Sequence, residues 1–321
     1  SDLFALQSSA MKKPPTISLH DGQISVKLAN GKTTLLRSVE IDLHPEPIAN
    51  HDNGFEQPFA LKGTFSSDHF RHAELRGRID PRTQSWEIDG HVQEFIFSPR
   101  LSEALPLPVE AEPLTSLTAT VQLEFHSEHH RGRGESPAFS VAARVENGHW
   151  EDPRVPFPIT DIQATLHASE SELRMEDFSA RCGKSTLEMA VSLQGYSPES
   201  PCEIHLHARQ FELLPELLPS FPESWRVAWE KLSPAGIVHA DVHAIYDGKA
   251  WQPNVVVECL DTSFAYYRFP YRMTEGRGQL QFKDGVLTTD NFQAMARRSE
   301  EHTSELQSHL NLVCRLLLEK K

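Results

Sequence analysis

The 321-residue sequence is short of positive charge and of long apolar runs. Its 31 Lys and Arg residues are outnumbered by 45 Asp and Glu, which gives a formal net charge of −14. A basic groove for nucleic acid is therefore not expected. No run approaches the roughly 20 apolar residues that a membrane-spanning helix needs, and no signal-peptide pattern opens the chain. The first residue is Ser1, and we interpret the sequence as a fragment of a longer protein.

Recognisable catalytic motifs are also lacking. The sequence contains no glycine-rich phosphate loop, no G-x-S-x-G elbow and no H-E-x-x-H pair. We therefore expect a protein that is not an enzyme, with no catalytic residues, no metal ligands and no cofactor.

Cysteine is too scarce for a disulfide scaffold, and no Cys-x-x-Cys pair suggests a zinc or redox site. Cys182 and Cys202 flank a predicted hairpin, so one bridge is an option in an oxidising compartment. Buried free thiols are the alternative.

The C-terminal segment needs separate treatment. Residues 298–321 read RSEEHTSELQSHLNLVCRLLLEKK and resemble a translated sequencing adapter, so we interpret them as an artefactual tail. A genuine amphipathic terminal helix is the alternative. Residues 1–16 are expected to be a poorly ordered lead-in.

Alternation of apolar and polar residues is the strongest signal present. It sends successive side chains to opposite faces of a sheet and predicts about 14 strands in an antiparallel meander, with a few short helices. Asp-Gly and Asn-Gly pairs predict the hairpin turns. The alternating runs are Leu35-Arg37-Val39-Ile41-Leu43, Leu117-Ala119-Val121-Leu123-Phe125, Phe139-Val141-Ala143-Val145, Leu187-Met189-Val191-Leu193 and Val238-Ala240-Val242-Ala244-Tyr246. The turn pairs are Asp21-Gly22, Asn30-Gly31, Asn147-Gly148, Asp247-Gly248 and Asp284-Gly285.

An internal repeat accompanies the alternation. His91, Phe95 and Leu101 precede His207, Phe211 and Leu217 by 116 positions. Similar matches continue downstream, so residues of about 85–181 and 201–296 are predicted to be two copies of one unit. Such repeats usually stack into an array.

These patterns resemble the AsmA-like family, whose members include TamB and YhdP. The resemblance rests on the cadence I-x-L-x-D-G-x-I at 17–24, on the L-x-G strand ends at 61–63 and 193–195, and on the strand closing at 178–180. It covers most of residues 17–297. It implies an elongated antiparallel sheet curled into a groove that carries lipid between the inner and outer membranes of the bacterial envelope.

The resemblance also implies a location and partners. The full-length protein is expected in the periplasm, anchored to the inner membrane by an N-terminal helix that this sequence lacks. Phospholipid or a similar amphiphile is the expected ligand, with no nucleic acid. The residues predicted to line the groove are Leu117, Val121, Leu123, Phe125, Val141, Val145, Leu187, Val191, Val238 and Val242.

Two other functions remain open from the residues alone. One is a structural or adhesive β-rich surface protein, in which the same apolar faces pack against a second sheet. The other is a metal-dependent hydrolase, because His and Asp side chains alternate on one face of two predicted strands. That cluster would contain His205, His207, His239, Asp241 and His243.

Overall fold

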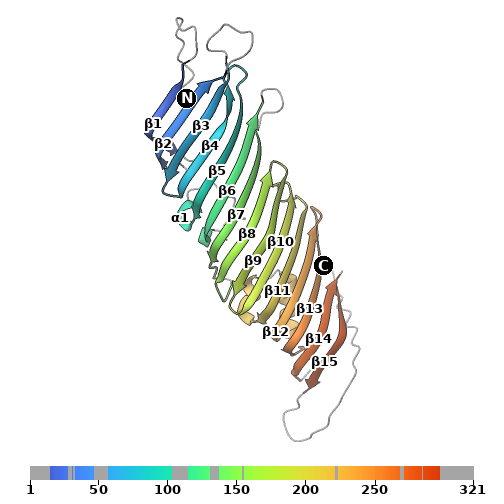
Figure 1. Cartoon of the computed structure of the whole chain (residues 1–321). Coiled ribbons are helices and arrows are strands. Elements are labelled where there is room, and N and C mark those ends of the chain that lie inside the picture. The colour runs from blue at the N-terminus through green and yellow to red at the C-terminus, as the bar shows by residue number, and fades with distance from the viewer. Residues whose placement is uncertain are drawn as a thin grey trace. The chain divides into compact units, whose positions relative to one another are not determined.

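The computed structural model shows an all-β fold in which fifteen strands form one antiparallel sheet (Figure 1). It describes residues 15–27, 31, 33–46, 57–102, 115–130, 137–153, 155–220, 223–267, 271–283 and 285–296. The strands are β1 (Ile17–Lys27), β2 (Thr33–Pro45), β3 (Phe59–Ser67), β4 (Phe70–Asp80), β5 (Ser85–Phe97), β6 (Thr118–His129), β7 (Ala138–Trp150), β8 (Ile159–Ser169), β9 (Glu172–Cys182), β10 (Ser185–Gln194), β11 (Cys202–Leu213), β12 (Ala235–Tyr246), β13 (Trp251–Phe264), β14 (Met273–Lys283) and β15 (Val286–Ala296). The helices are α1 (Pro99–Ser102), η2 (Pro215–Ser220) and α2 (Glu223–Leu232).

Each strand pairs with its neighbours in the sequence, from β1 at one end of the strand order to β15 at the other. This confirms the predicted antiparallel meander with a few short helices. The expected curl into a groove is not seen, because the sheet is open and not strongly curled. The predicted lead-in (1–16) and tail (298–321) lie almost wholly outside the described residues. Within the described part of the chain, no helix combines the length and the apolar character of a membrane span.

The chain divides into two compact units. The first comprises residues 1–146 and 165–171, and the second comprises residues 147–164 and 172–321. Strands β1 to β6 belong to the first unit and β9 to β15 to the second, whereas β7 and β8 contribute to both.

In the first unit, apolar residues lie opposite one another on consecutive strands. Because side chains alternate between the two faces of a strand, a row of register partners lies on one face. The apolar row consists of Leu19, Ile41, Gly63, Leu75, Gly90 and Phe125, one from each of β1 to β6. The adjacent row on the opposite face consists of Ser18, Asp42, Lys62, Arg76, Asp89 and His126.

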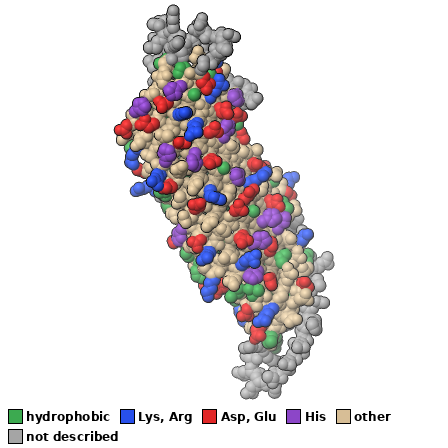
Figure 2. Space-filling model, viewed as in Figure 1, with side chains coloured by type: hydrophobic (Ala, Val, Ile, Leu, Met, Phe, Trp, Pro, Cys, Tyr) green, Lys and Arg blue, Asp and Glu red, His purple; other side chains and the backbone are tan. Residues whose placement is uncertain are grey.

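The second unit repeats this division into an apolar face and a polar face. Its longest apolar row runs without a polar residue from β9 to β15. The row consists of Phe178, Met189, Leu206, Val242, Val255, Phe282 and Leu287. The polar faces are rich in charge, and Figure 2 shows acidic, basic and histidine side chains intermixed over the strands.

Nine strands contain one residue in the left-handed conformation, with φ between 48° and 56°. Beside Ser38, Glu94 and Gln210 the register shifts by one residue, so two residues oppose one on the next strand. These are β-bulges, which increase local twist. The nine residues are Asp21, Ser38, Glu94, Asn147, Asp161, Asp177, Gln210, Glu275 and Asn291.

The bulges change which residues share a face. Because the bulge at Ser38 inserts one residue, Leu36 joins Val39 on the apolar face, and its register partner is Ile24 of β1. The predicted grouping of Leu35 and Arg37 with Val39 is therefore wrong.

Two of the predicted turns are wrong, because their residues lie inside strands. Asp247-Gly248 does lie between β12 and β13, but Asp21-Gly22 lies inside β1 and Asn147-Gly148 inside β7. Asp and Asn tolerate the left-handed conformation, and a bulge uses that tolerance as readily as a turn does. Asn30 and Asp284 are outside the described residues.

Bulges and helices recur at the spacing of the predicted repeat. Glu94 and Gln210 are 116 positions apart. Prolines begin α1 and η2 at the same spacing, and each helix buries a leucine, Leu101 and Leu217, to 5% exposure. The two strand–bulge–helix segments therefore share one local plan.

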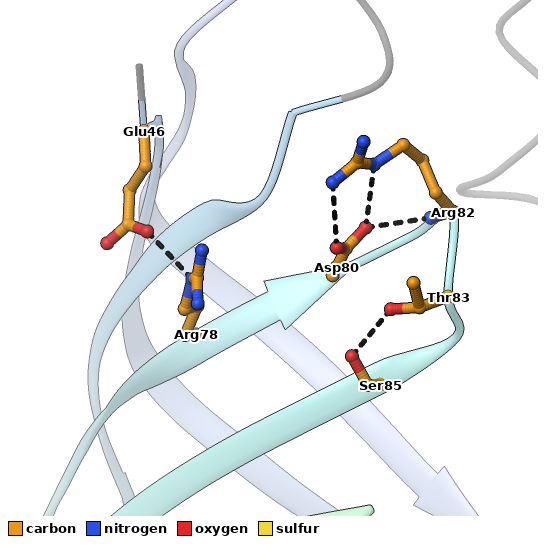
Figure 3. Close-up of polar contacts among 6 residues, drawn as sticks. All are labelled: Glu46, Arg78, Asp80, Arg82, Thr83 and Ser85. Carbon is orange, nitrogen blue, oxygen red and sulfur yellow. Dashed lines mark hydrogen bonds and ion pairs between the residues drawn. The ribbon is translucent and has the colours of Figure 1, made fainter. Parts of the chain in front are cut away.

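A hairpin turn between β4 and β5 illustrates how polar side chains fix the loops. The carboxylate of Asp80 accepts hydrogen bonds from the backbone N–H of Arg82 at 3.0 Å and from its guanidinium at 3.1 and 3.2 Å (Figure 3). Burial opposes ionisation of Asp80, but these bonds outweigh it and the pKa of the carboxyl is lowered. Two residues before Asp80 on β4, Arg78 pairs with Glu46 at 2.8 Å.

The cysteines do not form the bridge considered from the sequence. Cys182 pairs with Ser185 at the start of β10, and Cys202 pairs with Leu193 near its end. Eight residues of strand separate these points by about 27 Å, too far for a disulfide. Both thiols are free, and burial raises their pKa.

Candidate functional site

The predicted lining residues, except Leu117, lie at alternating positions on four strands. Leu117 precedes β6. In β6 and β12 the register partners of these residues are apolar, for example Leu123 with Val92 and Val242 with Leu206. The strand positions are Val121, Leu123 and Phe125 on β6, Val141 and Val145 on β7, Leu187 and Val191 on β10, and Val238 and Val242 on β12.

Exposure separates these residues into two kinds. Val238 is 1% exposed, Val145 8% and Val121 9%, so they are sheet core. The other seven are half-buried, which leaves apolar surface in contact with solvent. The described strands form a single sheet, so no second sheet among the described residues covers this face.

The polar face of the first unit carries a shallow depression of about 440 Å³. It lies over β4 to β7, and its wall includes Arg76, Asp89 and His126. His126 Nδ1 lies 2.8 Å from Asp89 Oδ1, and this hydrogen bond raises the pKa of the histidine. The depression is open and charged, so it offers no enclosed apolar pocket.

A second polar cluster lies on β11 and β12 in the second unit. His205 and His243 are register partners, and their imidazole rings stack with centroids 4.0 Å apart. Both Nε2 atoms meet one carboxylate oxygen, Glu203 Oε1, at 3.1 Å from His205 and 2.8 Å from His243. The hydrogen bonds from His243 and His205 lower the pKa of Glu203.

This cluster differs from the one expected from the sequence. His207 and Asp241 are register partners two positions further along the same face, and they pair with each other at 3.1 Å. His239 does not join, because its Nδ1 accepts a hydrogen bond at 3.0 Å from the backbone N–H of Gln210 at the bulge of β11. The five residues share one face of the sheet, as expected, but they do not meet at a single point.

Glu203 is the member that the sequence analysis missed. It stands two residues before His205 and so shares its face of the strand. That spacing is the signal that could have identified it.

Comparisons of the chain with protein-family models, with curated proteins and with solved structures gave no match.

Proposed function

We propose that the apolar face of this sheet lines part of a conduit for phospholipid, as a segment of an AsmA-like envelope protein. The observation that carries the proposal is the unbroken apolar row from Phe178 on β9 to Leu287 on β15, together with the half-buried state of seven of the ten lining residues. In this proposal the lipid lies along the apolar face of the open sheet.

The dimensions of the row suit an acyl chain. Seven strands at about 4.8 Å spacing extend over about 29 Å. Each methylene transferred from water to an apolar surface contributes about 0.8 kcal/mol, so a 16-carbon chain could gain on the order of 10 kcal/mol. Contact with a continuous apolar surface is thus sufficient to hold lipid without a specific pocket.

Movement requires that neighbouring positions bind with similar free energy. Successive strands provide similar binding free energies, because an acyl chain displaced by one strand meets an equivalent apolar surface. The proposal places the full-length protein in the periplasm, anchored to the inner membrane, with the opposite charged face in water.

Lipid extraction from the purified chain followed by mass spectrometry tests this function. We expect phospholipid to copurify in stoichiometric amounts when the chain is expressed in the periplasm of a diderm bacterium. A chain that carries no lipid after purification, and takes up none from labelled phosphatidylethanolamine vesicles, would contradict the conduit and favour a structural role.

A further inference from the structure

We infer that Glu203, His205 and His243 form a binding site for a divalent transition-metal ion of the zinc type. The site lies on the polar face of β11 and β12, opposite the apolar face assigned to lipid, because Ile204 and Leu206 alternate with the ligands. The inference is therefore independent of the proposed lipid function.

The ligand atoms already converge. One carboxylate oxygen and one ring nitrogen from each histidine lie within 4.8 Å of one another. In a tetrahedral zinc site with ligand bonds of about 2.0 Å, ligand atoms are about 3.3 Å apart. Glu203 Oε1 is 2.8 Å from His243 Nε2 and 3.1 Å from His205 Nε2. A metal ion can replace the shared protons once rotation about the side-chain bonds turns the two rings out of their stacked arrangement, because a bound metal lies near the plane of each imidazole.

The sheet fixes two of the ligands before metal binds. His205 and His243 are direct register partners on adjacent antiparallel strands, and their rings are nearly parallel, at 15°. A pair of imidazoles suits zinc, copper and nickel. The register holds the backbone of both histidines in place, which lowers the entropy that must be lost when the ion binds.

Among the described residues, the strands on either side place uncharged register partners beside the two imidazoles. The residue flanking His205 on β10 is Ala190, and the residue flanking His243 on β13 is Asn254. In the next row, His207 pairs with Asp241 at 3.1 Å. Asp241 therefore adds negative potential, which favours a divalent ion.

Two imidazoles and one carboxylate leave a fourth tetrahedral position for water or for an exchangeable ligand. The three side chains are exposed or half-exposed, so the ion can enter from solvent.

The test is calorimetric titration of the metal-free 321-residue chain with Zn²⁺, with Co²⁺ absorption as a second measurement. We expect the His205→Asn and His243→Asn variants each to bind this Zn²⁺ on the order of 100-fold more weakly, and the tetrahedral Co²⁺ band to disappear. Glu203→Gln should weaken binding on the order of tenfold.

His20→Asn is the matched control, because His20 also pairs with a glutamate, Glu40, at 2.7 Å but has a single imidazole. It should leave the Zn²⁺ isotherm unchanged. Circular dichroism and urea unfolding of every variant separate loss of a ligand from loss of the fold. A folded His205→Asn/His243→Asn double variant that binds Zn²⁺ as the unmodified chain does would overturn the inference.

Discussion

Phe125 on β6 lies directly opposite Gly90 on β5, and its ring fills the space beside that glycine. A Cβ at position 90 would lie 2.2 Å from two carbons of the Phe125 ring and 3.0 Å from Leu75. The apolar row of the first unit therefore continues across a residue without a side chain, because an aromatic ring from the next strand covers it.

The first prediction follows from this contact. Gly90→Ala should destabilise the chain by about 1 to 3 kcal/mol, because the ring of Phe125 must move out of a favourable rotamer. Urea unfolding followed by tryptophan fluorescence measures the change.

Gly63→Ala is the control for that substitution. Gly63 belongs to the same row, but the nearest atoms to an added Cβ there are at 3.4 Å or more. We expect a change smaller than about 1 kcal/mol. Equal destabilisation by the two alanines would show that the Phe125 contact is not the cause.

The second prediction concerns lipid loading. Leu187→Thr/Val191→Thr adds two hydroxyls to the apolar face of β10 while keeping residues that favour strands. Bound phospholipid, measured by mass spectrometry, should fall several-fold.

The matched variant places the same residue on the other face of the same strand. Glu188→Thr/Ser192→Thr should retain the lipid content of the unmodified chain, because these positions alternate with the apolar ones. A similar loss of lipid in both variants would contradict the assignment of the lipid to the apolar face.

The third prediction is a pH effect at His126. Its hydrogen bond to Asp89 raises the pKa of the imidazole above its ordinary value of 6.5. A raised folded-state pKa stabilises the fold fully below the ordinary value, and the contribution is lost as the pH rises through the folded-state pKa. Asp89→Asn should lower the pKa of His126 and remove this pH dependence, as NMR titration of the imidazole will measure.

Asp68→Asn serves as its control, because Asp68 pairs with Arg37 and contributes nothing to the His126 hydrogen bond. The His126 titration should not change in that variant. If Asp89→Asn left the titration midpoint where it was, the hydrogen bond could not be the source of the raised pKa.

The fourth prediction concerns the bulge at Gln210, where φ is 52°. Gln210→Gly should stabilise the fold by up to about 1 kcal/mol, because glycine adopts this conformation without a Cβ clash. Gln210→Val should destabilise it by about 1 to 3 kcal/mol, since a β-branched residue is least suited to positive φ. The order of unfolding midpoints, Gly above Gln above Val, is the readout, and any other order argues against a strained bulge.

The sequence was sufficient to predict the class of fold because alternation is a local signal. Leu117 to Phe125 alternates regularly, and Val121, Leu123 and Phe125 share one face of β6. Bulges were harder to predict. Glu94 and Gln210 belong to residue types with no strong preference for positive φ, so only the pairing of neighbouring strands reveals them.

The histidine cluster could also be predicted only in part. His205 and His207, like Asp241 and His243, are separated by one residue, and this spacing correctly placed each pair on one face of its strand. Which residues meet depends on the register between β11 and β12, which shifts by one residue at the bulge at Gln210. His239 accepts a hydrogen bond from the backbone of this bulge, whereas His205 lies opposite His243.

The strictly sequential strand order has an evolutionary consequence. Insertion or deletion of one hairpin changes the number of strands by two and leaves every other pairing intact, because no strand depends on a distant partner in the sequence. A lineage could therefore lengthen or shorten such a sheet in hairpin steps without redesigning the contacts between the strands that remain.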